Sequence, residues 1–590
     1  MHKLLDIEFL ARVPEVEVEF DVSPTGDRVV FTDNRTGRFE VYLLDLETRA
    51  IRQLTDHSRG ATCPRFSPDG EHVIYAQDHD GDERWDFHLI HLATGRSRCV
   101  LEQRVSGYPA ASWSPDGRSL LITSAHDGRF TLHRYDLETG ALTLLTRHAF
   151  NDERGVFSPD GRWIAFDAHT VGQDRGIFVI APNGADLLAL PLPDATDPQW
   201  SPDGRFLLFH AMRESEDVGV FELATGQVRW LAESRWDEWG AAWSPDGQHA
   251  LYLENEDGAH SVCVVHVASG ERIARIAPED GVIERARFAR GGRSVVFEFS
   301  NHRTPNSLWE YHLDTRACEQ ITPPLEGAHD APFIAPYYVR YESADGLTVP
   351  AIVYPARQVG RDAGAILLIH GGPTWAYHNF WHPAAQHFAQ MGYTVIGPNY
   401  RGSTGYGRAY QNANRYDIGR GDVLDCIAGV EWLLREGMAS RDKIGVTGAS
   451  QGGYMTMMCL AKYPDYWAAG SSLIGFFNYF TEFETEREDL RYWDLQNMGD
   501  PAKPEDAERY RDRSPIFFID RVTAPVQLIA GRTDPRCPAA ETERVHHALR
   551  ARGVPVEMIL YEDEGHGFSK VENRIDAYRR RAEFFARHLG

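Results

Sequence analysis

The stretch Ser67-Pro68-Asp69-Gly70, followed by the apolar run His72-Val73-Ile74-Tyr75-Ala76, decides the fold of the first half of this chain. Proline presets the dihedral of a turn's second position and glycine accepts a positive φ, so the tetrapeptide predicts a chain reversal. The apolar, β-branched and aromatic residues after it are typical of a buried strand. The stretch therefore predicts a tight turn leading into a strand.

Copies of this stretch recur at a nearly constant spacing. Successive copies begin 43 to 47 residues apart, at Ser23, Ser67, Ser114, Ser158, Ser201, Ser244 and Ala289, the first and last being degenerate. Several strands within such a period, without helical periodicity, indicate one four-stranded propeller blade. Seven copies predict a seven-bladed β-propeller. A solenoid of similar period is the alternative, which the all-strand pattern disfavours.

The second half of the chain has a different pattern. A proline-rich stretch over 323–336 predicts a linker. Beyond it, short continuous apolar runs such as Ala365 to Ile369 alternate with helical patterns such as Val423 to Arg435. Continuous apolar strands indicate a sheet that is covered on both faces. We predict a propeller over 1–322 and a mostly parallel, doubly wound α/β domain over 337–590.

Composition limits the partners and the compartment. The 590 residues include 61 basic and 86 acidic side chains, a net charge of −25, which argues against nucleic-acid and anionic-membrane partners. No apolar run approaches the roughly 18 residues of a membrane span, and Met1 to Glu8 does not resemble a signal peptide. We therefore expect a cytoplasmic protein. The seven scattered cysteines contain no C-x-x-C pair, and we expect no metal and no cofactor.

The segment Gly448-Ala449-Ser450-Gln451-Gly452 matches the G-x-S-x-G pattern of a serine nucleophile. An apolar strand over 443–447 runs into it, and a helical pattern over 453–461 runs out. A sharp turn between strand and helix lifts the serine hydroxyl clear of the sheet, and the helix N-terminus favours developing negative charge. The sequence predicts Ser450 as the nucleophile.

A serine nucleophile needs a base and an acid that orients the base. Asp534 follows the strand that ends at Ala530, and His566 follows the next strand, in the order Ser, Asp, His of an α/β-hydrolase. We predict that His566 takes the proton of Ser450 and that Asp534 holds the imidazole. The alternatives are a turn aspartate before Pro535 and an ordinary loop histidine.

The segment His370-Gly371-Gly372-Pro373 follows the strand Ala365 to Ile369. This H-G-G type of sequence brings a backbone N–H toward the nucleophile. We predict that the N–H groups of Gly372 and Gln451 form the oxyanion hole. The alternative is an ordinary tight turn.

These motifs, together with Asn399-Tyr400-Arg401-Gly402-Ser403, resemble the prolyl oligopeptidase family of serine peptidases over nearly the whole chain. The resemblance implies an α/β-hydrolase domain whose active site is capped by the propeller, so that short peptides enter and folded proteins do not. The H-G-G-P form is most similar to the acylaminoacyl-peptidase branch. Prolyl oligopeptidases proper carry a tyrosine at position 370, whose hydroxyl helps form the oxyanion hole; here the backbone of Gly372 would have to serve.

The resemblance also implies residues that bind the substrate. Arg536 would bind a backbone carbonyl next to the scissile unit, and an aromatic group would line the pocket for the residue before the cut: Phe476, Phe477, Tyr479 and Phe480. The alternative for the aromatic group is packing against the propeller. Arg532 and Arg401, with Arg536, form a candidate cluster that captures a C-terminal carboxylate, as in a carboxypeptidase. Acidic propeller pairs that hold a free amine would instead make a dipeptidyl peptidase.

The expected function is that of a cytosolic serine peptidase that cleaves short or N-acylated peptides through a covalent acyl-enzyme. Carboxypeptidase and dipeptidyl-peptidase specificities remain alternatives on the same scaffold. An esterase with the same three residues is a further alternative, because acyl transfer does not distinguish an amide from an ester. A non-catalytic propeller scaffold is the alternative from another class. Family members often associate, which implies a homo-oligomer.

Overall fold

The computed structural model describes residues 5–57, 60–102, 105–125, 128–171, 174–325, 331–357 and 362–590. The chain divides into two compact units. One consists of Pro14–His79 and Glu83–Leu325, and the other of Met1–Val13, Asp80–Asp82 and Glu326–Gly590. The predicted linker over 323–336 includes 326–330, which lie outside the described residues.

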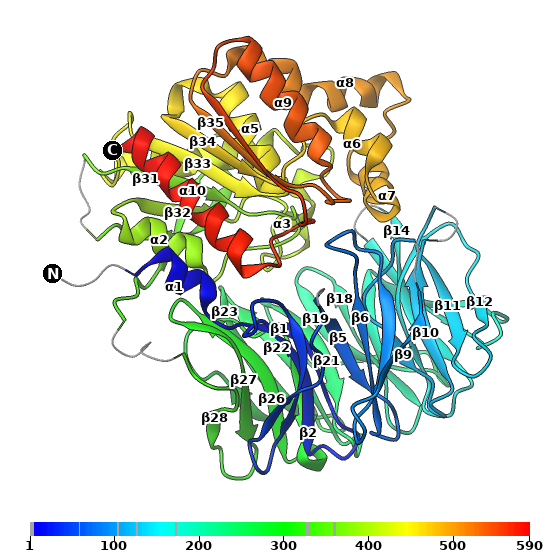
Figure 1. Ribbon diagram of the computed structural model, residues 1–590. Coiled ribbons are helices and arrows are strands. Elements are labelled where there is room, and N and C mark those ends of the chain that lie inside the picture. The colour runs from blue at the N-terminus through cyan, green and yellow to red at the C-terminus, as the bar shows by residue number, and fades with distance from the viewer. Residues whose placement is uncertain are drawn as a thin grey trace. The chain divides into compact units, whose positions relative to one another are not determined.

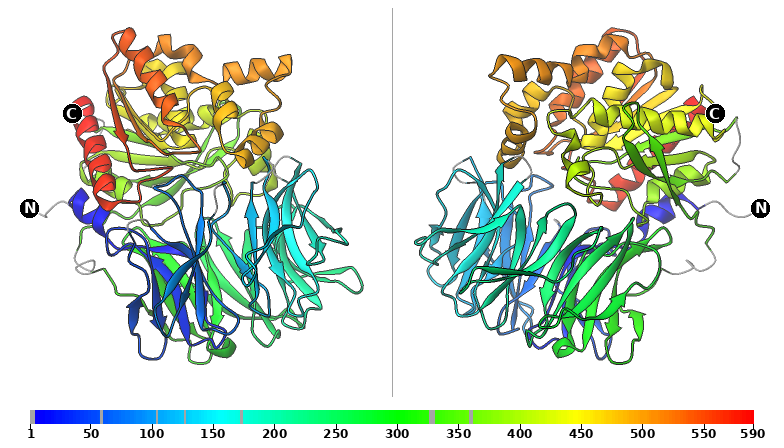
Figure 2. Two further views of the ribbon diagram at one scale, coloured as in Figure 1. Left: turned by 45° about the vertical axis from the view of Figure 1, so that its right-hand side comes forward. Right: turned by 180° about the vertical axis from the view of Figure 1, so that it is seen from behind.

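The described residues of the first unit form seven four-stranded antiparallel sheets, each built from one continuous segment (Figure 2). The first four are β1 (Val16–Val22), β2 (Arg28–Asp33), β3 (Glu40–Asp45), β4 (Ile51–Gln53); β5 (Thr62–Phe66), β6 (His72–Gln77), β7 (Asp86–His91), β8 (Ser97–Leu101); β9 (Ser112–Trp113), β10 (Ser119–Ser124), β11 (Thr131–Asp136), β12 (Leu142–Leu144); β13 (Asn151–Phe157), β14 (Ile164–Val171), β15 (Asp174–Ile180), β16 (Leu188–Pro193). The last three are β17 (Ala195–Trp200), β18 (Phe206–Met212), β19 (Glu216–Glu222), β20 (Gln227–Trp230); β21 (Asp237–Trp243), β22 (His249–Glu256), β23 (Ala259–His266), β24 (Arg272–Ile276); β25 (Ala286–Ala289), β26 (Ser294–Asn301), β27 (Thr304–His312), β28 (Cys318–Gln320). The predicted seven-bladed propeller is confirmed.

The repeated tetrapeptide makes the turn between the first two strands of a blade. Between β5 and β6, Gly70 has a φ of 69°, and the N–H of His72 donates to the Ser67 hydroxyl at 2.9 Å. The equivalent glycines Gly117 and Gly161 both have a φ of 68°. A positive φ is costly for a residue with a Cβ, so the turn explains the recurring glycine.

The ring of blades is closed by side-chain packing. Val16 and Phe20 of β1 share one apolar cluster with Val296 of β26 and Leu308 of β27, so the first blade packs against the last. Within the described residues, each blade uses its own four consecutive strands and none is exchanged across the seam. Hydrophobic contact therefore closes the propeller together with polar contacts between the same two blades, such as the ion pair of Arg49 with Glu310 at 2.8 Å.

The second unit contains an eight-stranded sheet in the order β29-β30-β32-β31-β33-β34-β35-β36 (Figure 1). Its strands are β29 (Tyr337–Glu342), β30 (Thr348–Tyr354), β31 (Ala365–Ile369), β32 (Thr394–Pro398), β33 (Ile444–Ala449), β34 (Ala469–Leu473), β35 (Val526–Gly531) and β36 (Val556–Tyr561). Pairing is antiparallel from β29 to β32 and parallel from β32 to β36. The predicted mostly parallel sheet is confirmed.

Helices cover both faces of this sheet. Alternate residues of β31 enter two different apolar clusters: Leu367 packs with α4 (Gly421–Arg435), α5 (Gln451–Lys462) and α9 (Ala539–Ala551). Ile366 packs with α2 (Pro383–Gln390) and α10 (Val571–Leu589). The sheet is therefore doubly wound. Further α-helices of this unit are α3 (Arg408–Gln411), α6 (Tyr479–Thr485), α7 (Glu488–Asn497) and α8 (Pro504–Asp512).

Helix α1 (Ile7–Arg12) belongs to the second unit, although the sequence assigns it to the propeller. Arg12 pairs with Glu572 at 2.9 Å, and Arg574 donates to the Ala11 carbonyl at 2.7 Å. Ala11 is also buried against Ile575 of α10. This helix carries no turn tetrapeptide and no strand pattern, so the blade repeat did not define where it packs.

Among the described helices, none is long and apolar enough to cross a membrane.

Candidate active site

Ser450 lies at a strained turn between β33 and α5. Its backbone has φ 60° and ψ −124°, an unfavourable conformation for a residue with a side chain. The flanking glycines are required by close packing: a Cβ on Gly448 would lie 2.5 Å from the Ile369 carbonyl oxygen, and one on Gly452 only 2.2 Å from it. The predicted nucleophile elbow is therefore formed, and it presents Ser450 at the carboxyl edge of the parallel strands.

Three side chains from three loops meet at this edge in one hydrogen-bonded series. The Nε2 atom of His566 lies 2.8 Å from Ser450 Oγ, and its Nδ1 atom lies 2.8 Å from Asp534 Oδ2. The loops follow β33, β35 and β36, whose carboxyl ends lie on the same edge because these strands are parallel. The structure thus brings together all three residues of the predicted triad.

The Asp534 carboxylate is fixed by the backbone of its own loop. The N–H groups of Arg536 and Cys537 donate to Asp534 Oδ1 at 2.8 and 2.9 Å. The side chain is buried. With the carboxylate held in this way, Asp534 Oδ2 and Oδ1 lie 2.8 and 3.0 Å from His566 Nδ1, so the loop fixes the orientation of the imidazole.

The loop over 370–373 lies against the nucleophile. A Cβ on Gly371 would lie 3.3 Å from Ser450 Cβ and 3.9 Å from its Oγ. Gly372 has a φ of 119°, which glycine tolerates best. On the other side, Gln451 is the first residue of α5, so its N–H has no acceptor within the helix. Gln451 therefore adjoins Ser450 in the chain, and Gly372 follows the glycine whose backbone approaches Ser450.

His370 anchors this loop. Its Nδ1 atom hydrogen-bonds the Gly371 carbonyl at 2.7 Å, its Nε2 atom hydrogen-bonds the Ser403 hydroxyl at 3.0 Å, and its ring stacks on Tyr400 at 4.2 Å. Burial lowers the pKa of His370 to about 4. The ring is therefore neutral near pH 7 and positions the loop without adding charge beside Ser450.

The predicted aromatic pocket is largely part of the domain core. Phe477 and Tyr479 are almost fully buried in the cluster that covers one face of the sheet. Phe476 stacks on Tyr454 at 4.7 Å, and Phe480 packs on Tyr510 at 5.6 Å. The packing alternative therefore accounts for Phe477 and Tyr479. Both side chains pack within the core of the α/β domain.

Arg401 has a structural environment that argues against substrate binding. Its guanidinium donates from Nε and Nη2 to Asp425 at 2.9 and 2.7 Å, and from Nη1 and Nη2 to Asp345 at 2.8 and 3.0 Å. The side chain is buried, and these contacts use four of its five N–H groups. Arg401 joins three segments of the fold.

The two arginines that flank Asp534 differ from each other. Arg532 is exposed and pairs with Glu543 at 2.7 Å and Glu562 at 3.2 Å, which raises its pKa further above the ordinary value. Arg536 is half-buried, and its backbone N–H holds Asp534. The predicted cluster of three arginines is therefore divided, because Arg401 and Arg532 are each engaged by two carboxylates.

Sequence reasoning missed a group of buried acids near the triad. Glu482 lies at the middle of α6, Glu486 lies four residues later as the C-cap of that helix, and Asp494 lies on α7. Burial, reinforced by neighbouring carboxylates, raises the pKa values of Glu482 and Glu486 well above their usual range, and burial raises that of Asp494 to about 7. The four-residue spacing was the only sequence signal for this group.

Potential metal ligands also occur at the site. Asp534, Cys537 and His566 each offer one atom, and these atoms lie within 4.8 Å of one another. Asp534 and His566 are already hydrogen-bonded to each other, so a metal ion held here would replace the contact that orients His566 toward Ser450. The donor set therefore fits a hydrogen-bonded triad better than a metal centre.

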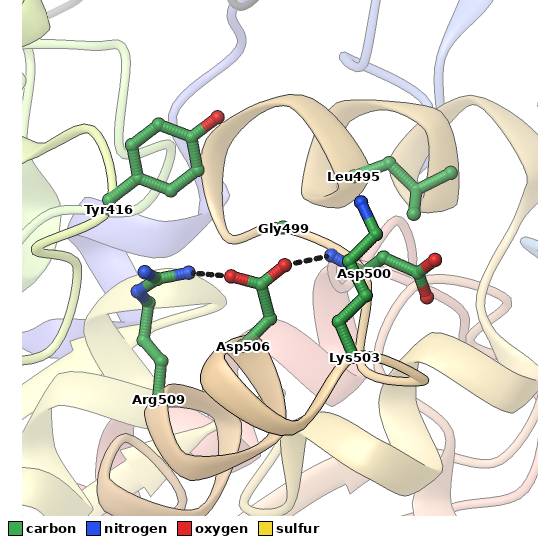
Figure 3. A pocket seen from close by; sticks show the side chains of 7 residues that line it. All are labelled: Tyr416, Leu495, Gly499, Asp500, Lys503, Asp506 and Arg509. Atoms are coloured by element: carbon green, nitrogen blue, oxygen red, sulfur yellow. Dashed lines mark hydrogen bonds and ion pairs between the residues drawn. The ribbon is translucent and has the colours of Figure 1, made fainter.

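A separate cavity of 410 Å³ lies beside α7 and α8 (Figure 3). Two of its charged groups are paired with each other: Asp506 accepts from Arg509 Nη1 at 2.6 Å, and it also accepts from the Asp500 N–H at 2.9 Å. The residues that line it are Tyr416, Leu495, Gly499, Asp500, Lys503, Asp506 and Arg509. None of them belongs to the triad.

The fold and the site define a class of protein: an α/β-hydrolase domain with a Ser/His/Asp series, encoded together with a seven-bladed propeller. The prolyl oligopeptidase family matches residues 379–590, and the TolB beta propeller domain matches 83–290. Residues 379–590 therefore carry a domain of the prolyl oligopeptidase family, as the motifs predicted.

Relatives carry different specificities in their names. Dipeptidyl peptidase family member 6 of Caenorhabditis elegans is 35% identical over 232 residues, and the acylamino-acid-releasing enzyme of Mus musculus is 29% identical over 231 residues. Each match covers 38% of this chain and 31% of the relative's length. The structure of a puromycin hydrolase matches with a TM-score of 0.86 at 22% identity, covering 100% of this chain and 97% of the other, which supports the fold.

Proposed function

We propose that this protein is a serine peptidase that hydrolyses short peptides through an acyl-enzyme formed on Ser450. The observation that carries the proposal is the hydrogen-bonded series from Ser450 through His566 to Asp534 at a nucleophile elbow. A serine hydroxyl becomes a useful nucleophile when an oriented base accepts its proton. Each residue of the series supplies one of those requirements.

The reaction follows from the order of these contacts. His566 Nε2 accepts the proton of Ser450 Oγ as the oxygen attacks the scissile carbonyl carbon, and Asp534 stabilises the resulting imidazolium. The N–H groups of Gly372 and Gln451 stabilise the oxyanion. His566 then returns the proton to the leaving amine as the C–N bond breaks. Water, deprotonated by His566, attacks the ester and releases the acid and Ser450.

Among the specificities, we favour short peptides processed near their N-terminus, including N-acylated ones. The names of the two curated relatives, a dipeptidyl peptidase and an acylamino-acid-releasing enzyme, support this choice. The carboxypeptidase alternative has less support, because Arg401 and Arg532 are engaged by carboxylates within the protein. The cytoplasmic location and association into a homo-oligomer are parts of this proposal.

Two alternatives share the fold and the Ser450 geometry but differ in the reaction. An esterase would use the same nucleophile, because an ester carbonyl is attacked in the same way as an amide. A non-catalytic scaffold would leave Ser450 unreactive despite its geometry. Labelling with a fluorophosphonate probe tests the scaffold alternative: we expect label on wild type and on the control Ser440→Ala, and none on Ser450→Ala. Labelling that persists in Ser450→Ala would contradict the proposed nucleophile.

The peptide specificity is tested by mass spectrometry of products. One peptide is offered in three forms: with both ends free, with an acetylated N-terminus, and with an amidated C-terminus. An ester of its first residue is offered alongside. We expect cleavage near the N-terminus that tolerates C-terminal amidation. Cleavage abolished by amidation would support a carboxypeptidase, and turnover of the ester alone would support an esterase.

A further inference from the structure

The 410 Å³ cavity beside α7 and α8 lies within the α/β unit, and its walls are joined to one another (Figure 3). The Tyr416 N–H donates to the Asn497 carbonyl at 2.8 Å, which ties the loop before α4 to the end of α7. Arg509 of α8 donates to the Met498 carbonyl at 2.6 Å. The cavity is therefore preformed, since hydrogen bonds within the protein hold its three segments together.

Two apolar side chains of the lining remain in contact with water. Tyr416 has a φ of 59°, a conformation that costs free energy for a bulky residue. The guanidinium carbons of Arg509 and Arg415 lie 4.9 and 5.1 Å from the centroid of its ring, so the ring is held in place. Tyr416 is nevertheless 43% exposed, and Leu495 is 37% exposed. Together they offer a surface that an apolar side chain of a ligand would cover.

The lining also contains one cation and one carboxylate oxygen without partners. Among the residues that the structure describes, none forms a hydrogen bond or an ion pair with the Lys503 ammonium. Asp500 Oδ1 accepts from the Ala502 N–H at 3.0 Å, whereas Asp500 Oδ2 has no partner among the described residues. The Lys503 N–H donates to the Asp500 carbonyl at 2.9 Å, so both side chains belong to one turn. One positive and one negative group of the cavity are therefore available to a ligand.

The charges of the lining favour a ligand that carries both signs. Arg509 and Asp506 neutralise each other at 2.6 Å, which leaves Lys503 and Asp500 as the groups that face a ligand. An anion would be attracted by Lys503 and repelled by Asp500, and a cation would experience the reverse. A molecule with an ammonium, a carboxylate and an apolar side chain matches both charged groups and the exposed apolar surface.

We propose that this cavity binds a zwitterion with an apolar side chain, either a free α-amino acid or an unblocked dipeptide. Lys503 donates to the carboxylate of the ligand, and Asp500 Oδ2 accepts from its α-ammonium. Tyr416 and Leu495 contact its side chain. The site shares no residue with the triad, so the inference goes beyond the proposed peptidase function and does not depend on it.

A series of ligands tests each part of this assignment. Saturation-transfer NMR on the full chain gives the Kd values, with Ser450→Ala as the background so that a dipeptide is not consumed. The ligands are leucine, leucylleucine, N-acetylleucine without the ammonium, leucinamide without the carboxylate, and glycine without the side chain. We expect loss of either charge to raise the Kd about fivefold or more, the scale of a half-exposed hydrogen bond to a charged group. Glycine should bind about tenfold more weakly than leucine, because it buries no apolar side chain.

Variants of the cavity assign the two charges to their residues. Lys503→Met should raise the Kd of leucine about fivefold or more and leave that of leucinamide unchanged, because leucinamide has no carboxylate to lose. Asp500→Asn should weaken leucine by a similar factor and leave N-acetylleucine unchanged. The controls are Lys443→Met and Glu505→Gln, two residues that do not line the cavity, and neither should change any Kd.

The outcomes separate the two sources of the zwitterion and show when the site is wrong. A lower Kd for leucine than for leucylleucine assigns the free amino acid, and the reverse assigns the dipeptide. Equal Kd values for leucine, N-acetylleucine and leucinamide would overturn the proposal, as would a Kd of leucine that neither cavity variant changes. Absence of binding of both zwitterions up to about 10 mM, well above the Kd of a weak site, would also overturn it. The ligand series needs no change in the cavity, so it decides even if a cavity variant folds poorly.

Discussion

Gly371 lies so close to Ser450 that a Cβ on it would come within 3.3 Å of the Ser450 Cβ and 3.1 Å of the Ala449 carbonyl oxygen. Both distances are tighter than ordinary van der Waals contact, and the oxygen belongs to the backbone of the elbow. The loop that follows β31 therefore approaches the nucleophile as closely as a residue without a side chain allows.

Replacement of Gly371 by alanine should push this loop away from Ser450. We expect kcat to fall about 100-fold, the usual effect of losing one oxyanion-hole donor, with little change in KM. Steady-state kinetics measures this split, and thermal unfolding of the variant serves as the control for folding. Full activity of Gly371→Ala would show that the loop does not take part in the reaction.

Replacement of Asp534 by asparagine should leave the loop folded, because the N–H groups of Arg536 and Cys537 can still donate to a side-chain oxygen. The amide would favour the wrong imidazole tautomer, so we expect kcat to fall about 10³- to 10⁴-fold. The exposed Asp520→Asn is the control and should keep full activity. A loss smaller than about tenfold would contradict the role of Asp534 as the orienting acid.

Replacement of Arg401 by alanine should destabilise the protein by about 3–5 kcal/mol, because Asp425 would remain buried without its partner. Arg532→Ala removes an arginine from exposed ion pairs and should cost less than about 1 kcal/mol. Urea denaturation of both variants measures the difference. Normal stability of Arg401→Ala, with selective loss of peptides that carry a free C-terminal carboxylate, would restore the predicted substrate-binding role.

Asp494 should make stability depend on pH. Its pKa is raised from 3.8 to about 7 in the fold, so the unfolded chain releases this proton first as pH rises. The free energy of unfolding should therefore decrease between about pH 4 and 7 through this group and level off above that range. Asp494→Asn should gain stability relative to wild type at pH 8 and little at pH 4. The exposed Asp465→Asn is the control, and an equal effect of both variants at pH 8 would contradict the prediction.

The loop Asp80–Asp82, grouped with the α/β unit, contacts the loop of His566. The Thr533 hydroxyl donates to the Asp80 carbonyl at 2.6 Å, and a Cβ on Gly81 would lie 2.5 Å from the Gly565 nitrogen. We expect Gly81→Ala to displace His566 and to lower kcat about 100-fold, as a shift of about 1 Å does in other enzymes. Gly37→Ala, also at a positive φ but in open space, is the control. Similar activity of the two variants would contradict this positioning role.

Local sequence patterns predicted much of the fold. A tetrapeptide such as Ser67 to Gly70 encodes its turn through its own dihedral preferences, so its repetition predicted the number of blades without knowledge of any distant contact. The elbow around Ser450 was equally local, because two crowded glycines and a strand-to-helix junction lie within five residues. The order of Asp534 and His566 along the chain was sufficient to predict that they meet Ser450, because the parallel strands before them end at the same edge of the sheet.

Only the tertiary structure decided which polar side chains are engaged within the protein. Arg401 looked like a substrate ligand, but its partners Asp345 and Asp425 lie 56 and 24 residues away in the chain. Conversely, the sequence analysis did not single out Glu482 and Glu486, and the fold buries them with one oxygen of each, Glu482 Oε2 and Glu486 Oε1, without a hydrogen-bond partner. Turn and strand preferences act between adjacent residues, whereas burial and ion pairing depend on segments that meet only after folding. The sequence by itself therefore determined the architecture and the candidate nucleophile, and the packing of distant segments decided which charged side chains are paired within the protein.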